Sequence, residues 1–143
     1  MIREAVTKDL DVIATLEKSI FDNPYSNEQI SKDISCGNVR VIEHDGFVVG
    51  YITYTHVADE AEIERIAVNS LYRKMGLGTI LVMHALQELK EYGVCKVFLE
   101  VKKQNTPARQ LYLKCGFKPI SERKKYYHDG SDAIIFVNNL EVQ

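Results

Sequence analysis

The chain has 143 residues, 45% of them hydrophobic, and a formal net charge of −2. A chain of this length buries one core rather than two, so we expect a single domain over residues 1–143. Its weakly acidic charge does not favour nucleic acid and no stretch reaches the roughly 20 apolar residues of a membrane span, so we expect neither as a partner.

The three cysteines, Cys36, Cys95 and Cys115, are odd in number and lack the paired spacing of a zinc site. They argue against a disulfide scaffold and favour a reducing compartment. The start of the chain, Met1–Val6, lacks the apolar stretch of a signal peptide. The four histidines are scattered without a cysteine or serine at a useful spacing. We therefore expect a cytoplasmic protein without a metal.

Two short helices are predicted near the start. Apolar residues recur at helical spacing from Leu10 to Ile20, and Asn23-Pro24 ends this helix. Ser26 with Gln29 three residues later is typical of a capping box, and the helix that follows is expected to end at Gly37. The first half also contains β-rich runs, and Asp45-Gly46 is a strong hairpin signal between two of them. The strands expected here cover residues 2–6, 39–44, 47–55 and 60–68.

In the second half of the chain, predicted helices and strands follow one another. An amphipathic helix follows Gly78 and stops near Gly93, and a shorter one opens at Thr106-Pro107 and is closed by Gly116. A turn at Asp129-Gly130 joins the last two strands. The strands expected here cover residues 95–101, 117–127 and 133–140. This order is not the regular alternation of a doubly wound fold and suits a mixed, mostly antiparallel sheet with helices packed on it.

A basic glycine loop connects the strand at 60–68 to the helix after it. Gly76 and Gly78 let the backbone approach a bound group, and the helix start offers unpaired N–H donors. Arg73 and Lys74 add two cations at the same place. The loop is therefore expected to bind an anion.

Two familiar phosphate motifs fit this loop poorly. A P-loop needs a Lys-Ser/Thr pair after its last glycine, whereas Thr79-Ile80 follows Gly78. The dinucleotide fingerprint would find an acid, Glu100, at about the right distance, but its third glycine position is Leu81 and the loop is long and basic. Neither an NTPase nor a dinucleotide site is favoured.

The pattern R-x-x-G-x-G, formed by Arg73, Gly76 and Gly78, resembles the pyrophosphate loop of the GNAT superfamily of N-acetyltransferases. Leu99-Glu100-Val101, followed by Asn105, Leu111-Tyr112 and Cys115-Gly116-Phe117, is similar to the next strand and helix of that family. The resemblance implies a GNAT fold of the α/β (α+β) class, a seven-stranded, mostly antiparallel sheet flanked by about four helices, and acetyl-CoA as co-substrate. The residues that it implies for acetyl-CoA binding are Ile66, Ala67, Val68, Arg73, Lys74, Met75, Gly76, Leu77, Gly78, Thr79 and Asn105.

Within the superfamily the chain resembles the branch that acetylates protein N-termini, in particular the bacterial ribosomal-protein alanine N-acetyltransferases. The similarity rests on Asn23-Pro24-Tyr25-Ser26 and on Tyr126-Tyr127 with the turn after it. The implied partner is a protein N-terminus, that of a ribosomal protein, gripped by loop aromatics. These candidate acceptor-binding residues are Phe21, Tyr25, Tyr126 and Tyr127. An acetyltransferase of small amines and a non-catalytic CoA-binding module remain the alternatives.

Glu100 is the candidate general base. Strand alternation places it on the same face as Phe98 and Lys102, opposite Val97 and its apolar neighbours. The residues alone also allow a strand-end acid paired with Lys102 or Lys103. In the family, the glutamate of this segment is the proposed base, so the resemblance implies that role for Glu100.

Tyr112 is the candidate general acid, because a phenol with a pKa near 10 keeps its proton at neutral pH and can donate it to a thiolate. A tyrosine on the apolar face of a helix also suits the core. The family places its catalytic tyrosine here. We expect the ring to pack and the hydroxyl to act.

Three other polar residues have two possible roles each. Asn105 can contact the pantetheine arm of acetyl-CoA, as the family implies, and can cap the following helix. Glu62 and Glu64, two residues apart on one strand face, are either solvated or reserve bases. Of Tyr126 and Tyr127, we expect one to be buried and the other to be free for the acceptor.

Overall fold

The computed structural model describes residues 1–140. Its helices and strands are β1 (Ile2–Glu4), α1 (Leu10–Ile20), α2 (Asn27–Ser35), β2 (Val39–His44), β3 (Phe47–Val57), β4 (Glu60–Val68), α3 (Leu77–Glu91), β5 (Lys96–Lys102), α4 (Thr106–Lys114), β6 (Lys118–Arg123) and β7 (Ala133–Asn139). The strands form a seven-stranded sheet in the order β1-β2-β3-β4-β5-β7-β6. β4 and β5 pair in parallel, whereas β1/β2, β2/β3, β5/β7 and β6/β7 pair antiparallel. This confirms the predicted fold class.

Contacts divide the chain into two compact units, and each is made of two stretches. The first unit comprises Met1–Tyr54 and Arg65–Val82, and the second comprises Thr55–Glu64 and the chain from Met83 on. β3, β4 and α3 contribute to both. The expectation of a single domain over residues 1–143 is not tested by this division, and residues 141–143 lie outside the described part.

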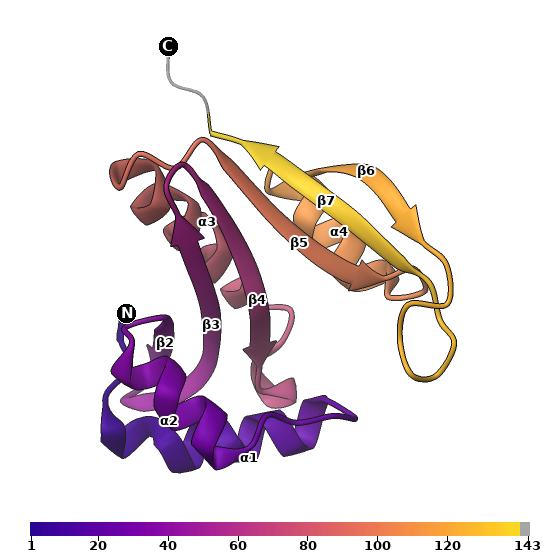
Figure 1. The fold of residues 1–143 in the computed structure, drawn as a ribbon. Coiled ribbons are helices and arrows are strands. Elements are labelled where there is room, and N and C mark those ends of the chain that lie inside the picture. Colours follow the sequence, from indigo (N-terminus) through magenta and orange to yellow (C-terminus); the bar gives the residue numbers. More distant parts are fainter. Residues whose placement is uncertain (141–143) are drawn as a thin grey trace. The chain divides into compact units, whose positions relative to one another are not determined.

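The first unit is built by two helices that pack together beside β2 and β3 (Figure 1). Its core includes Ile13, Leu16, Ile30 and Tyr51, as the helical periodicity predicts. Asp45 and Gly46 both have left-handed φ angles, 53° and 84°, so the predicted hairpin turn is confirmed. The Ser26 hydroxyl accepts the Gln29 N–H (3.1 Å) as the predicted N-cap, but the Gln29 side chain bonds Asp33 instead of closing the capping box.

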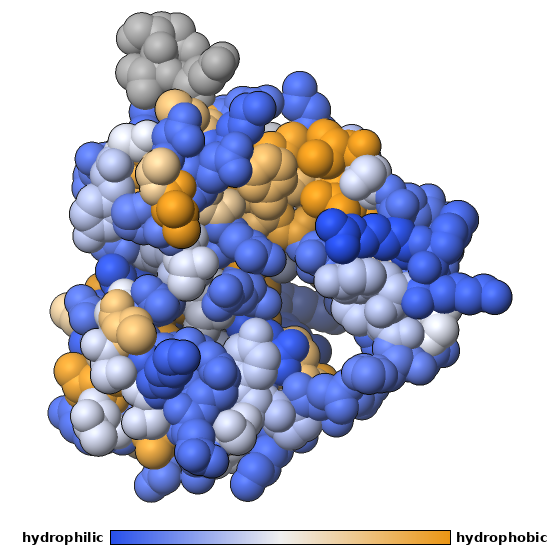
Figure 2. Space-filling view, viewed as in Figure 1, coloured by the Kyte–Doolittle hydropathy of each residue, from blue (hydrophilic) through white to orange (hydrophobic). Residues whose placement is uncertain are grey.

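The second unit contains β5, β7 and β6, and α4 lies behind these strands in the view of Figure 1. Val97, Leu99 and Val101 are buried, and Phe98, Glu100 and Lys102 are half-buried on the opposite face, which confirms the predicted alternation of β5. Polar residues cover most of the face shown in Figure 2, and its largest apolar area lies over β6 and β7.

Two strand predictions were too long. β6 ends at Arg123, and residues 124–132 form a loop in which Lys125 has a left-handed φ of 51° and donates its N–H to Asp132 (2.9 Å). β1 ends at Glu4, because Asp9 accepts the Val6 N–H (2.8 Å) and the chain then turns into a 3₁₀ helix, Thr7–Asp9. In both cases an aspartate side chain takes a backbone donor that a longer strand would have used.

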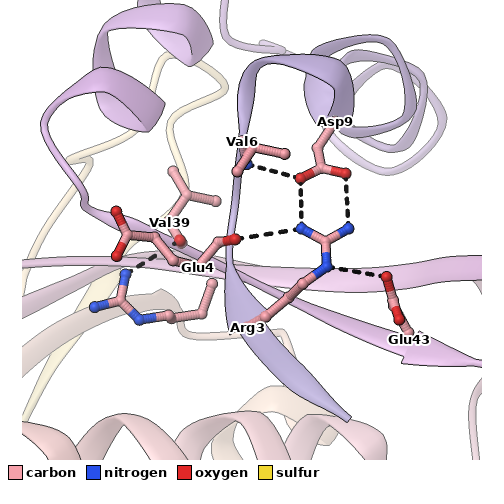
Figure 3. A network of polar contacts seen from close by, with 7 residues as sticks. Arg3, Glu4, Val6, Asp9, Val39 and Glu43 are labelled. Carbon is pink, nitrogen blue, oxygen red and sulfur yellow. Dashed lines mark hydrogen bonds and ion pairs between the residues drawn. The ribbon is translucent and has the colours of Figure 1, made fainter.

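Arg3 joins the start of the chain to the sheet through a partly buried ionic network (Figure 3). Its guanidinium donates two bonds to Asp9 (2.8 and 3.0 Å) and one to Glu43 (3.0 Å). Only 5% of the Asp9 side chain is exposed. The hydrogen bonds from Arg3 hold the pKa of Asp9 below its ordinary value of 3.8, against the opposing effect of burial. The charged pair therefore stabilises the folded state.

We predict that Arg3→Met destabilises the protein by about 2–3 kcal/mol near neutral pH, because a buried carboxylate loses its partner. A carboxyl with a lowered folded pKa stabilises above its unfolded pKa and loses that contribution as pH falls through its folded pKa. The difference between wild type and variant should therefore shrink at acidic pH. Urea unfolding at about pH 7 and about pH 3.5 measures it, and an equal difference at both would contradict the assignment.

Candidate active site

The glycine loop lies in the first unit, between the end of β4 and α3. Ile66–Val68 are the last residues of β4, and a 3₁₀ turn, Ser70–Tyr72, follows. Lys74 and Gly76 then adopt left-handed φ angles of 70° and 78°. This conformation favours glycine, and it turns the chain sharply into the helix.

The first turn of α3 presents free amide donors. The first backbone bond at its start runs from the Ile80 N–H to the Gly76 carbonyl (3.1 Å). The N–H groups of Leu77, Gly78 and Thr79 precede this bond, so they have no partner within the helix. Unpaired amides at the positive end of a helix dipole are an arrangement typical of anion sites.

The flanking side chains of the loop are exposed. Lys74 and Met75 face solvent, and so does Arg73, whose Nε donates to the Val68 carbonyl (3.2 Å). This bond folds Arg73 back on the end of β4. Both cations belong to the same exposed turn as the amide donors, which fits a phosphate-bearing group.

The second unit contains a cavity of about 480 Å³ between β4, β5 and the end of β6. Three carboxylates line it, from Glu60, Glu62 and Glu100, together with Phe98 and Arg123. Glu62 pairs in register with Phe98 across the parallel β4–β5 ladder, which brings the two strands' polar faces to the same cavity. Glu64 belongs to the same strand but does not line it.

Glu62 and Glu100 act on each other electrostatically. Burial, and then the negative charge of Glu100, raise the pKa of Glu62 above its ordinary 4.5. The lysines that could have neutralised Glu100 are engaged elsewhere: Lys102 Nζ lies 2.9 Å from Asp129, and Lys103 Nζ lies 3.0 Å from Glu122. Repulsion from the Glu100 charge therefore favours the protonated form of Glu62.

Tyr126 and Tyr127 come from the loop between β6 and β7, and their rings meet edge to face at 5.3 Å. A hydrogen bond to Glu100 is the main cause of a raised pKa at Tyr126, and burial followed by the charge of Glu100 raises that of Tyr127. Tyr126 is exposed and Tyr127 is half-buried rather than buried, so the expected division of roles is only partly seen. Both tyrosines adjoin the candidate base.

Tyr112 is buried on α4, 6% exposed, with its ring against Phe117 and Phe136 (5.8 and 6.2 Å between centroids). Burial is the main cause of its raised pKa, and Cys115 and Tyr127 contribute. Its hydroxyl donates to no residue that the structure describes. The ring therefore packs as expected. Tyr127 contributes to the raised pKa of Tyr112, and the charge of Glu100 contributes to the raised pKa of Tyr127.

Asn105 caps α4, since its side-chain oxygen accepts the Ala108 N–H (3.3 Å). The side chain is exposed, and its amide nitrogen has no partner among the described residues. The capping role expected from the sequence is present, and a donor remains for a ligand.

Phe21 and Tyr25 lie in the first unit, on the segment between α1 and α2. Two residues that the sequence analysis passed over, Glu17 and Arg65, hold this segment. Arg65 lies over both aromatic rings (3.8 and 4.1 Å to their centroids) and pairs with Glu17 (3.1 Å). The sequence holds one sign that Glu17 is buried: it lies four residues after Ile13, on the apolar face of α1.

Among residues 1–140, no group of three or more His, Cys, Asp or Glu side chains is arranged to hold a metal ion. No helix in this part of the chain is long and apolar enough to cross a membrane.

Several known proteins are similar to this chain in sequence and in fold. The sequence pattern of the acetyltransferase (GNAT) family matches residues 7–117. The [ribosomal protein bS18]-alanine N-acetyltransferase of Escherichia coli (strain K12) is 37% identical over 133 residues, which cover 90% of each chain. An N-alpha-acetyltransferase of Sulfurisphaera tokodaii is 37% identical over 113 residues, covering 70% of this chain and 68% of that protein.

A crystal structure of the ribosomal-protein-S18-alanine N-acetyltransferase from Escherichia coli superimposes with a TM-score of 0.91 at 29% identity, covering 100% of this chain and 95% of that one. Sequence and fold thus agree over nearly the whole length. The chain belongs to the acetyltransferase (GNAT) family and is an N-acetyltransferase that uses acetyl-CoA.

Proposed function

We propose that the chain acetylates the α-amino group of a protein N-terminus in the cytoplasm, and that the natural acceptor is the N-terminal alanine of a ribosomal protein. The observation that carries the proposal is the cavity of the second unit, whose wall contains both Glu62 and Glu100, with Tyr126 near enough to Glu100 for that carboxylate to raise its pKa. The names of the relatives from Escherichia coli and Sulfurisphaera tokodaii support it.

The glycine loop is our proposed site for the pyrophosphate of acetyl-CoA. The amides of Leu77, Gly78 and Thr79 would donate to its oxygens, with Arg73 and Lys74 as cations and Asn105 as a donor to the pantetheine arm. The left-handed turn at Lys74 and Gly76 supports this assignment, because it leads the chain directly into the helix start, where those amides have no partner within the helix. Acetyl-CoA supplies an acetyl group already activated as a thioester.

We predict that Gly78→Glu raises the Kd for acetyl-CoA about 100-fold. A carboxylate about 5 Å from a pyrophosphate charge costs roughly 3 kcal/mol at an effective dielectric constant of about 20. The fold should survive, because an acidic residue suits the first turn of a helix. Gln87→Glu, further along the exposed face of α3, is the matched control. Calorimetry that finds wild-type affinity in folded Gly78→Glu would remove the loop from the site.

Glu100 is proposed as the group that accepts the proton of the attacking amine, with Glu62 beside it. A carboxylate within reach of the amine can accept its proton as a general base. Tyr112 is proposed to donate a proton to the departing thiolate.

An α-amino group suits this modest base better than a lysine does. Its pKa is about 7.7–8.0, against about 10.4 for a lysine side chain, so deprotonation near neutral pH requires about 3.4 kcal/mol less. A carboxylate pair without a metal or a histidine can then suffice. The exposed Tyr126 and the half-buried Tyr127, on the loop beside Glu100, are also suited to a peptide backbone rather than to a small amine.

Initial rates with a panel of peptides test the proposal. The peptides share one sequence and differ only in the first residue, Ala, Ser, Gly or Met, and an aliphatic polyamine is included. We expect the alanine peptide to have the highest kcat/KM. Faster turnover of the polyamine than of every peptide would favour a small-amine acetyltransferase instead.

A further inference from the structure

A buried carboxylate, Glu17, sits at the centre of a network in the first unit. Its side chain is 0% exposed. It accepts two bonds from the Arg65 guanidinium (Nε and Nη2, both 3.1 Å), one from the Tyr51 hydroxyl, and one from the Tyr25 backbone N–H (2.7 Å). Burial and the neighbouring Glu17 raise the pKa of Tyr51, so this phenol stays a donor. The carboxylate is fully hydrogen-bonded, as a buried charge must be.

The Arg65 guanidinium also contacts the segment Phe21–Tyr25. Besides the ion pair, Nη2 donates to the Asn23 carbonyl (2.8 Å), and its plane lies over the rings of Phe21 and Tyr25 (3.8 and 4.1 Å). Its side chain remains 19% exposed. A planar guanidinium can form a forked ion pair and stack on rings at the same time, whereas a lysine cannot.

The segment Phe21–Tyr25 has little backbone structure of its own, and its two rings pack against the core of the first unit. It has no helix or strand, and Asp22, Asn23 and Pro24 make no backbone–backbone hydrogen bond with another described residue. Its conformation therefore depends on side chains: Arg65 holds the Asn23 carbonyl and both rings, and Glu17 holds the Tyr25 amide.

We propose that Arg65 and Glu17 are positioning residues for the acceptor, because they preform the segment Phe21–Tyr25 that grips it. The inference rests on the proposed function, in which Phe21 and Tyr25 contact the acceptor peptide. A preformed segment needs no ordering when the acceptor binds, so the pair lowers the KM for the acceptor. It acts on neither the amine proton nor the leaving thiolate.

Arg65→Lys tests the inference through separate kinetic constants. It keeps the charge but loses the fork and the stacked plane, so the KM for the alanine peptide should rise about 10-fold. The KM for acetyl-CoA should stay within about 2-fold and kcat at saturating peptide within about 3-fold. The matched control is Arg3→Lys, which weakens a comparable forked pair in the same unit, with Asp9 (2.8 and 3.0 Å). It should lower Tm without changing the KM for the peptide.

Pro24→Gly provides a second variant, because Pro24 is exposed and its replacement leaves the ion pair intact. Loosening the segment should raise the peptide KM about 3-fold or more with little change in Tm. An unchanged peptide KM in both Arg65→Lys and Pro24→Gly would overturn the inference while leaving the proposed function intact. Wild-type protein that acetylates no peptide N-terminus would overturn both.

Discussion

Replacement of Glu100 by glutamine should lower kcat by about 10²- to 10⁴-fold, the usual contribution of a positioned proton acceptor. The amide keeps the size of the side chain and a hydrogen-bond acceptor for Tyr126, but it cannot take the amine proton. Binding of acetyl-CoA should be nearly unchanged, because the glycine loop lies on a different part of the chain. Single-turnover rates at saturating peptide, together with calorimetric titration of acetyl-CoA, measure both effects.

Two other carboxylates of the same cavity provide controls. Glu60→Gln removes a negative charge from the cavity wall without touching the pair, so kcat should stay within about 5-fold of wild type. Glu62→Gln removes the neighbour whose pKa the charge of Glu100 raises, and an intermediate loss is expected. If Glu62→Gln instead lowers kcat by about 10²-fold or more and Glu100→Gln keeps a kcat near wild type, the base is Glu62.

Replacement of Tyr112 by phenylalanine should lower kcat by about 10²-fold while Tm stays close to wild type. The ring contacts with Phe117 and Phe136 survive the change, and the hydroxyl donates to no described residue, so little stability is lost. Burial raises the pKa of Tyr112, which keeps the phenol protonated before it acts but makes it a reluctant donor. We therefore expect a smaller effect than at Glu100.

A second tyrosine provides the control for the role of Tyr112 as the general acid. Tyr127→Phe is the matched control, since this second tyrosine influences the pKa of Tyr112 but is not placed as the acid. Its kcat should fall less than that of Tyr112→Phe. Normal turnover of Tyr112→Phe with a lowered Tm would assign the residue to the core and leave the thiolate to be protonated by solvent.

Much of the fold could be predicted because local signals dominate it. Apolar spacing determined α1, Asp45-Gly46 the first hairpin, and Gly93 and Gly116 the ends of α3 and α4, with left-handed φ angles of 88° and 96°. The alternation of β5 also placed Glu100 on the correct face. Each of these depends on residues within a few positions of one another.

The contacts that shape the candidate site were not predictable in this way. Glu17 and Arg65 are 48 residues apart, and nothing local to either residue indicates the other. The electrostatic interaction between Tyr126 and Glu100 depends on the path of the 124–132 loop, which the sequence pattern assigned in part to a strand. Long-range pairing of polar side chains follows from the tertiary fold rather than from periodicity.

The most direct test of N-terminal acetylation uses one peptide that carries both a free N-terminal alanine and an internal lysine. After incubation with the protein and acetyl-CoA, fragmentation by tandem mass spectrometry locates the acetyl group. We expect a single acetyl group on the α-nitrogen of the alanine. An acetyl group on the lysine ε-nitrogen alone, with the α-amine unmodified, would contradict it.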